Sequence, residues 1–184
     1  MKHLMVDIET LDTEPTAVVV SIGAVRFDPD ATPNLGESRY LVLHRHGQSG
    51  RTISPATVDW WMQQPPAAQA VFADTTATRP FLALDLLDDL YSNARTGTAD
   101  NLWSHATFDE AILRSLYKSY NRKPPWQFRE TRDIRTLTAM AQHAGWKKNM
   151  DVPREGVHHN SLDDAKWQAR QVCAMFRFIR ERRP

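Results

Sequence analysis

A short apolar run that carries two acids opens the chain and strongly constrains its fold. Residues 4–8 read Leu-Met-Val-Asp-Ile, and Glu9 follows directly. A short, apolar run that contains branched side chains predicts a buried strand. Side chains two positions apart on a strand point to the same face, so Asp7 and Glu9 should project together while Val6 and Ile8 face the core.

Two carboxylates that are held close together and away from water repel each other. This arrangement is costly unless a cation lies between them. An Asp-x-Glu pair can equally lie on a solvated strand edge, where it needs no ligand. The apolar surroundings of Asp7 and Glu9 favour the cation site, which is a hypothesis as long as the pair stands alone.

The size and composition of the chain predict one ordinary folded domain that covers residues 1–184. Hydrophobic residues make up 41% of the chain and charged residues 24%, which is typical of a globular protein and excludes disorder throughout. There are 23 Lys and Arg against 22 Asp and Glu. This balance does not itself indicate a nucleic-acid partner, although an acidic metal site can mask a basic groove elsewhere.

The single cysteine and the lengths of the apolar runs predict a cytoplasmic protein without a membrane partner. Cys173 is the only cysteine, so no disulfide can form within the chain, which suits a reducing compartment. It falls in a helical pattern with apolar neighbours and is expected to be a small core residue. The apolar runs are too short for a membrane span, and the first of them is too short for a signal peptide.

The pattern of apolar and turn residues predicts an α/β fold with a mixed sheet flanked by helices. Three strands come first and should pair antiparallel, because their connections are short. Helices and strands then alternate. The expected strands cover residues 4–8, 18–27, 38–43 and 101–105, with a short extended piece near 128. The expected helices cover residues 54–65, 79–94, 108–120, 133–143 and 161–182, and loops are expected at 44–52, near 97 and at 145–156.

Two later segments offer further candidate site residues. Asp109 follows a predicted strand at the start of a helix, where it could be a metal ligand or simply complement the helix dipole. Residues 158–165 read HHNSLDDA and bring histidine to the start of the last helix. This segment could be an ordinary capped helix start with Ser161 as the cap. Alternatively, one histidine could act as a general base, because imidazole titrates near neutral pH.

Together the three segments resemble the DEDDh branch of the DnaQ-like 3′–5′ exonucleases. The D-x-E-T motif is Asp7 to Thr10, the F-D motif is Phe108-Asp109, and the H-x-(A/S)-x-x-D-A motif runs from His159 to Ala165. The motifs occur in the family's order and span nearly the whole chain. The stretches at 7–13 and 21–24 and the Trp60-Trp61 pair are most similar to the small bacterial and phage 3′–5′ exoribonuclease-like group. The resemblance implies a ribonuclease H-like mixed sheet.

The third motif fits in two registers, because His158 and Asp163 have the same separation as His159 and Asp164. Only the His159 register places Ser161 and Ala165 at the family's small-residue positions, so this register is the prediction. The chain also lacks the glycine that many relatives carry soon after D-x-E-T. Leu11-Asp12 stands there instead, so the turn and its substrate contacts could differ.

The resemblance implies that Asp7, Glu9, Asp109 and Asp164 hold two divalent cations, Mg²⁺ or Mn²⁺, and that His159 takes a proton from the attacking water. The substrate would be the 3′ end of single-stranded RNA or DNA, with the choice between them open, and the products nucleoside 5′-monophosphates. A metal-dependent phosphoesterase acting on small nucleotides and a non-catalytic nucleic-acid-binding module are the alternatives. Similar enzymes are often dimers, which makes a homodimer one expectation.

The residues next to the motifs are candidates for substrate contacts. The predicted substrate-binding residues are Thr10, Leu11, Trp61, His105 and Phe108. Adjacent helix positions point in different directions, so at most one of Trp60 and Trp61 should meet a base, and both could be core. Several basic residues could reach phosphates or could form a solvated helix face: Lys147, Lys148, Arg177, Arg180, Arg182 and Arg183.

Overall fold

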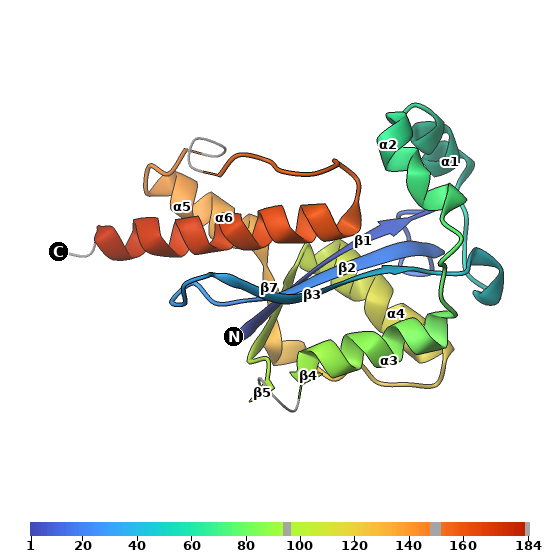
Figure 1. Cartoon of the computed structure of the whole chain (residues 1–184), viewed down its shortest axis with the longest axis horizontal. Helices are drawn as coiled ribbons and strands as arrows, with labels where there is room; N and C mark the ends of the chain where they lie inside the picture. The colour runs from blue at the N-terminus through green and yellow to red at the C-terminus, as the bar shows by residue number, and fades with distance from the viewer. Residues whose placement is uncertain (94–96, 148–151, 183–184) are drawn as a thin grey trace.

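A five-stranded sheet separates two layers of helices in the computed structural model, which describes residues 1–93, 97–147 and 152–182 (Figure 1). The strand order is β3-β2-β1-β6-β7. β1 pairs antiparallel with β2, and β2 with β3, whereas β1, β6 and β7 run parallel. The strands are β1 His3–Thr10, β2 Val19–Phe27, β3 Leu35–Val42, β6 Asn101–Ser104 and β7 Thr131–Asp133. The predicted mixed sheet, antiparallel first and then parallel, is confirmed.

The helices cover the two faces of the sheet and one end of β1. In Figure 1, α3 and α4 lie on one face, α5 and α6 on the other, and α1 and α2 stand beyond the end of β1. Their bounds are α1 Pro55–Met62, α2 Pro66–Gln69, α3 Pro80–Tyr91, α4 Ala111–Ser119, α5 Ile134–His143 and α6 Ser161–Glu181. In the described ranges, no helix has the length and apolar character needed to cross a membrane.

The alternation of side chains along β1 assigns its two faces. Leu4, Val6 and Ile8 are buried in the cluster that includes the apolar residues of α3 and α4. Met5 belongs to the other cluster, which includes the apolar residues of α6. Asp7 and Glu9 share the face of Met5, because side chains two apart on a strand point the same way. The acids of β1 therefore lie on the α6 side of the sheet.

The N-terminal end of α6 lies directly against the sheet at a glycine. Gly23 pairs with Asp7 across the β1–β2 ladder, and a Cβ added at Gly23 would lie 2.1 Å from the carbonyl carbon of Ser161. The Ser161 Oγ lies 2.9 Å from the Ser21 Oγ. Asn160 caps the helix, since its side chain accepts from the Leu162 and Asp163 amides, whereas the alternative of an ordinary helix start named Ser161 as the cap. Ser161 is instead buried between helix and sheet.

Several predicted element boundaries differ from the structure, and tertiary contacts explain the clearest case. The helix expected over 79–94 ends at Tyr91 and is followed by β4 Ser92–Asn93, which pairs with β5 Gly97–Thr98. Ala94 lies outside the described residues. The Arg26 guanidinium donates to the carbonyls of Leu90 and Tyr91 at the end of this helix, a long-range contact that no local pattern predicts. The loop expected near 97 is therefore part of a short hairpin.

Other differences are short helical turns within segments that were expected to be extended or irregular. Residues Phe128–Glu130 form a 3-10 turn just before β7, where an extended piece was expected, and Arg45–Gly47 form another within the predicted loop. Ala70–Ala73 form a third, in a stretch for which no element was predicted. The helix expected from residue 108 begins with a wider π-helical turn, Ala106–Glu110. The helix expected to end at Pro65 stops at Met62. The last helix agrees with its prediction to within one residue.

Candidate active site

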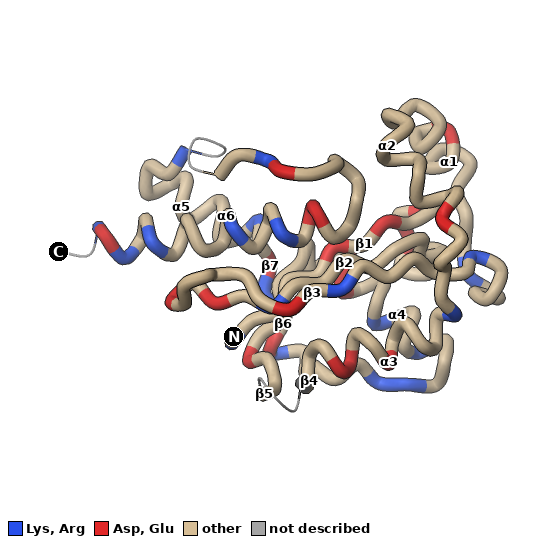
Figure 2. Tube along the Cα trace, in the orientation of Figure 1, with Lys and Arg blue, Asp and Glu red and all other residues tan. Residues whose placement is uncertain are grey.

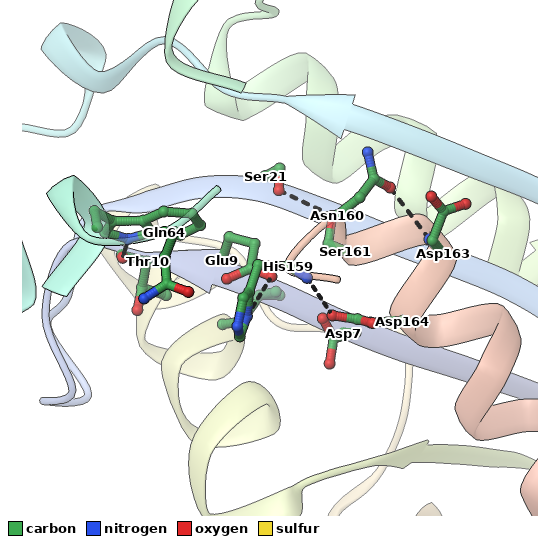
Figure 3. Close-up of polar contacts among 12 residues, drawn as sticks. Asp7, Glu9, Thr10, Ser21, Gln64, His159, Asn160, Ser161, Asp163 and Asp164 are labelled. Carbon is green, nitrogen blue, oxygen red and sulfur yellow. Dashed lines mark hydrogen bonds and ion pairs between the residues drawn. The ribbon is translucent and has the colours of Figure 1, made fainter. Parts of the chain in front are cut away.

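Four buried acids from three separate segments form one cluster. Asp7 and Glu9 come from β1, Asp109 from the turn after β6, and Asp164 from the first turn of α6. Their exposed fractions are 8%, 8%, 1% and 5%. Carboxylate oxygens of Asp7, Glu9 and Asp164 lie within 4.8 Å of one another, and carboxylate oxygens of Asp7 and Asp109 also lie within 4.8 Å of each other. In Figure 3, His159 and Asp164 face Asp7 and Glu9 from the start of α6.

Hydrogen bonds fix the orientation of three of these carboxylates. Asp109 accepts from the His105 amide at 2.7 Å and from the Ile8 amide at 3.4 Å, which ties the turn after β6 to β1. Asp7 accepts from Gln168 Nε2 at 2.6 Å. Asp164 accepts from the amide of His159 at 2.9 Å. The carboxylates are therefore held in place before any ligand arrives.

Burial and mutual repulsion disfavour the charged form of the clustered acids, and a bound cation would offset both effects. Burial, followed by the charges of Asp109, Glu9 and Asp164, raises the pKa of Asp7 well above its ordinary value of 3.8. Burial and the charges of Asp164 and Asp109 raise the pKa of Glu9 in the same way. Carboxylate oxygens are the ligands preferred by hard divalent cations. The residues present therefore fit a divalent metal site.

His159 lies beside the acids in an uncommon backbone conformation. Its φ is +65°, its Nδ1 is 3.9 Å from Glu9 Oε1, and its ring centroid is 4.8 Å from that of Trp60. Burial, and next the neighbouring His158, lower the pKa of His159 below its ordinary value of 6.5. His159 is therefore a largely neutral imidazole near neutral pH.

The two candidate registers of the third motif have different surroundings. Asp164 lies in the acid cluster, whereas Asp163 accepts from the amide of Val157 at 2.8 Å and points away from Asp7 in Figure 3. The His158 ring stacks on that of His159 at 3.8 Å and is exposed. The geometry favours His159 and Asp164 as the pair that serves the cluster.

Two clefts meet beside the acid cluster, at Glu9. One, of about 360 Å³, is lined by the acids, by residues of α5 and α6 that include Arg135, Gln142 and Gln171, and by Arg154 from the segment before α6. The other, of about 460 Å³, lies beneath α1 and is lined by Trp60 and by hydroxyl side chains that include Thr10, Thr13, Ser54 and Thr57. Ile8, Glu9 and Phe108 line both clefts. All four acids thus line the polar cleft, which borders the more apolar cleft at Glu9.

Four of the five predicted substrate-binding residues line one or both of these clefts. Thr10 and Trp61 line the cleft beneath α1, Phe108 lines both, and His105 lines the polar one. His105 Nδ1 lies 3.4 Å from Asp109 Oδ2. Leu11 is buried in the apolar cluster with Trp61 and does not line either cleft. The contacts of all five with a substrate remain predictions.

Trp60 and Trp61 have different environments. Trp61 is 3% exposed and its indole nitrogen donates to the Thr10 carbonyl at 2.9 Å. Trp60 is 40% exposed and lies against His159. Trp60 is therefore the more accessible of the pair, although Trp61 was the residue chosen from the sequence.

The basic residues proposed for phosphate contact lie away from the acids, among the residues that the structure describes. In Figure 2, Lys and Arg occur along α6, while acids mark the end of β1. Arg180 binds Asp30, and Arg182 donates to the Ala144 carbonyl. Arg177 and Arg180 line a separate pocket of about 240 Å³ next to Cys173. Lys147 and Arg177 are exposed, and Lys148 and Arg183 lie outside the described residues. Cys173 is a buried core residue, as predicted.

Three site residues escaped the sequence analysis. Gln168 follows Asp164 by four positions, so it lies on the same helix face, and that spacing could have identified it. Arg154 contacts Asp164 Oδ1 from the segment before α6, and no spacing rule predicts this contact. Gly23 allows the close approach of α6 to the sheet. Its role depends on a contact between distant segments.

The family of the chain follows from a comparison with protein-family models. The model described as the 3′–5′ exoribonuclease Rv2179c-like domain matches residues 2–176. The chain belongs to this family. This Rv2179c-like chain is accordingly a 3′–5′ exonuclease, as the motifs predicted. Comparison with curated protein sequences finds no match.

Solved structures confirm that the Rv2179c-like chain has the DEDDh exonuclease fold. The nuclease domain of 3′hExo, a DEDDh family member bound to rAMP, has a TM-score of 0.66 at 13% identity, covering 95% of this chain and 91% of that one. Exonuclease X in complex with 5′ overhanging duplex DNA has a TM-score of 0.58 at 17% identity, covering 95% and 91%. E. coli exonuclease I with a 5cy-dT13 oligonucleotide has a TM-score of 0.61 at 17% identity, but this chain spans only 41% of its length.

Proposed function

We propose that the Rv2179c-like chain removes nucleotides from the 3′ end of single-stranded RNA or DNA with two divalent cations, Mg²⁺ or Mn²⁺, and releases nucleoside 5′-monophosphates. The observation that carries this proposal is the cluster of four buried acids with His159 beside it. The rAMP and DNA bound to the structurally similar nucleases named above are consistent with it.

The acids and the histidine have separate roles in this proposal. Asp7, Glu9, Asp109 and Asp164 would hold the cations, which when bound lower the pKa of a water and stabilise the leaving 3′ oxygen. His159 accepts the proton of the attacking water, and its Nδ1 is the nitrogen that faces Glu9. Gln168 holds Asp7 through Nε2. Its buried Oε1 has no partner among the described residues and can accept a hydrogen bond from a water at the site.

The cleft beneath α1 suits the terminal nucleoside. Trp60 offers an accessible aromatic face, and Phe108 lies where the two clefts meet. Stacking of a base on an aromatic side chain contributes about 1–3 kcal/mol and tolerates any base. The hydroxyls of Thr13 and Thr57 line the same cleft and can bond the sugar. This cleft therefore favours a 3′-terminal nucleoside over a phosphate.

We further propose that residues 1–184 act as one exonuclease domain, since α6 supplies Asp164 to acids that come from β1 near the other end of the chain. A cytoplasmic location is proposed from the single cysteine. A homodimer remains a prediction from the resemblance.

The decisive experiment follows mononucleotide release from labelled single-stranded RNA and DNA of equal sequence, with Mg²⁺, with Mn²⁺ and with chelator. Metal-dependent release is expected from free 3′ ends, and Asp164→Asn should abolish it. Asp163→Asn is the matched control, because its amide oxygen can still accept from the Val157 amide. Asp163→Asn should retain most of the activity if His159 and Asp164 form the functional pair.

Two substrates separate the alternatives. If a 3′-blocked oligonucleotide is degraded as fast as an unblocked one, hydrolysis from the 3′ end is excluded. Faster hydrolysis of free nucleotide esters than of short oligonucleotides would favour the phosphoesterase, and binding without hydrolysis would favour the non-catalytic module.

A further inference from the structure

We propose that Arg154 binds the phosphate one nucleotide upstream of the scissile phosphate and thereby positions the strand in the cleft between α5 and α6. This inference rests on the proposed function, because it requires a nucleic-acid strand at the acids. It adds a positioning residue that the motifs do not contain.

The position of Arg154 is fixed from two sides. Its Nη1 contacts Asp164 Oδ1, and its guanidinium carbon lies 4.1 Å from the ring centroid of Trp167. The Trp167 indole donates to the Val152 carbonyl at 3.1 Å, which holds the segment of Arg154 against α6. The Arg154 side chain is 30% exposed and lines the polar cleft. A guanidinium is thus held at the edge of the acid cluster while still reachable from solvent.

The arrangement of the two clefts gives the direction of the strand. If the terminal nucleoside occupies the cleft beneath α1, the scissile phosphate lies at the acids. The remaining strand must then leave the cleft of Trp60, and the polar cleft, which the four acids line and Trp60 does not, is the adjoining space that can receive it. Arg154 lines this second cleft next to Asp164. The first phosphate upstream of the acids is therefore the one that Arg154 can meet.

Arg154 has more free hydrogen-bond donors for a phosphate than Arg135, the other arginine that lines the cleft. A guanidinium has five N–H donors in a planar fork that matches phosphate oxygens. Stacking on Trp167 leaves the edges of this fork free, and only Nη1 is used by Asp164. Arg135 is already bound to Thr107 and Asp133. Arg154 therefore keeps donors available without breaking a network.

The test compares two short oligoribonucleotides that differ at one linkage. One has a natural phosphate upstream of the scissile linkage, the other a neutral methylphosphonate, and the nucleotide on the 5′ side of that linkage is 2′-deoxy in both. Wild type, Arg154→Ala, Arg154→Lys and Arg170→Ala are compared by single-turnover release with Mg²⁺ and by binding anisotropy with Ca²⁺. Arg170 is the matched control, because it pairs with Glu155 nearby and does not line the polar cleft.

The effects of the methylphosphonate and of Arg154→Ala on binding affinity are expected not to add. The methylphosphonate should weaken binding to wild type and to Arg170→Ala about tenfold, the effect of losing one charged hydrogen-bond pair. Arg154→Ala should bind the natural strand about tenfold more weakly and lose nothing more with the methylphosphonate. Arg154→Lys should fall between, because lysine keeps the charge without the planar fork.

A full methylphosphonate penalty in Arg154→Ala would overturn the inference. The inference would also be overturned if Arg154→Ala bound the natural strand with unchanged affinity and changed only the rate of mononucleotide release or the metal requirement. That result would assign Arg154 to orienting Asp164. If wild type releases no mononucleotide with Mg²⁺, the proposed function fails, and the anisotropy comparison still decides whether Arg154 contacts that phosphate.

Discussion

His159 occupies the left-handed region of backbone space, with a φ of +65°. A residue other than glycine is uncommon there and needs surrounding contacts to hold it. Trp60 on one side and His158 on the other supply ring contacts, and its amide is bonded to Asp164. The conformation thus places the His159 ring and the Asp164 carboxylate at the same cluster.

The pH dependence of the reaction should report the lowered pKa of His159. A general base must be neutral, so kcat/KM should rise with pH and reach its plateau once the pH exceeds this pKa. Since burial lowers the pKa, the acid limb should have its midpoint below 6.5. His159→Gln should lower the rate by a factor of about 10²–10⁴ and remove this limb. The profile is measured with saturating metal at each pH, and a midpoint above 6.5 would contradict the assignment.

Substitutions at the two neighbouring tryptophans should have different consequences. Trp60→Ala should raise KM by about tenfold, because a stacked base contributes about 1–3 kcal/mol, with little effect on unfolding. Trp61→Ala should destabilise the protein by about 3–5 kcal/mol, as expected for a large buried side chain. Steady-state kinetics and urea unfolding of both variants test this, and a larger KM effect for Trp61→Ala that is not accompanied by destabilisation would contradict it.

At the scale of elements, the packing of α6 on β2 brings the last acid to the first two. Gly23 faces the backbone of Ser161 and pairs with Asp7 in the sheet. A side chain at this position would push the helix away from the strand that carries the acids. The packing of two elements therefore sets a distance within the active site.

Gly23→Ala should both destabilise the protein and inactivate it. Overpacking typically costs about 1–3 kcal/mol, and here the obstacle is backbone, which cannot rotate aside. Gly36→Ala is the control, because a Cβ there meets only the flexible side chain of Met1. Urea unfolding and nuclease assays are compared for both. Wild-type activity in Gly23→Ala would show that α6 tolerates the shift.

Element boundaries were predicted well where local periodicity decides them and poorly where distant contacts do. The long stripe of apolar residues in α6 predicted its extent almost fully, and the helix predicted over 133–143 differs from α5 only at Asp133, which caps it. The end of α3 is set by Arg26 from β2. A helix C-terminus that binds a guanidinium from elsewhere in the chain leaves no local signal.

At the scale of the whole molecule, the acid cluster should link metal binding to stability and pH. Asp7 and Glu9 have raised pKa values in the folded chain, so the unfolded chain loses these protons first as the pH rises. The folded state therefore binds more protons than the unfolded state between the ordinary values, 3.8 and 4.5, and the raised ones. With chelator present, the free energy of unfolding should fall as pH increases through this range.

Mg²⁺ should offset this loss, and more so at pH 8 than at pH 5, because a ligand that binds only the folded state stabilises it. Thermal unfolding with chelator and with Mg²⁺ at the two pH values measures the effect. Asp7→Asn should reduce the dependence on both pH and metal. Equal stabilisation by Mg²⁺ at both pH values would mean that protonation of Asp7 and Glu9 is not coupled to metal binding.

The sequence by itself determined the strand with its paired acids, the order of the elements, and the three motifs. Each of these depends on residues close together along the chain, where the two-residue period of a strand or the turns of a helix leave a visible pattern. Tertiary structure decided that Asp109 and Asp164 join Asp7, through the parallel pairing of β6 with β1 and the contact of α6 with Gly23. It also decided that Trp60 is accessible and that Arg154 reaches Asp164. These outcomes depend on which distant surfaces bury each other, and such contacts have no period along the sequence.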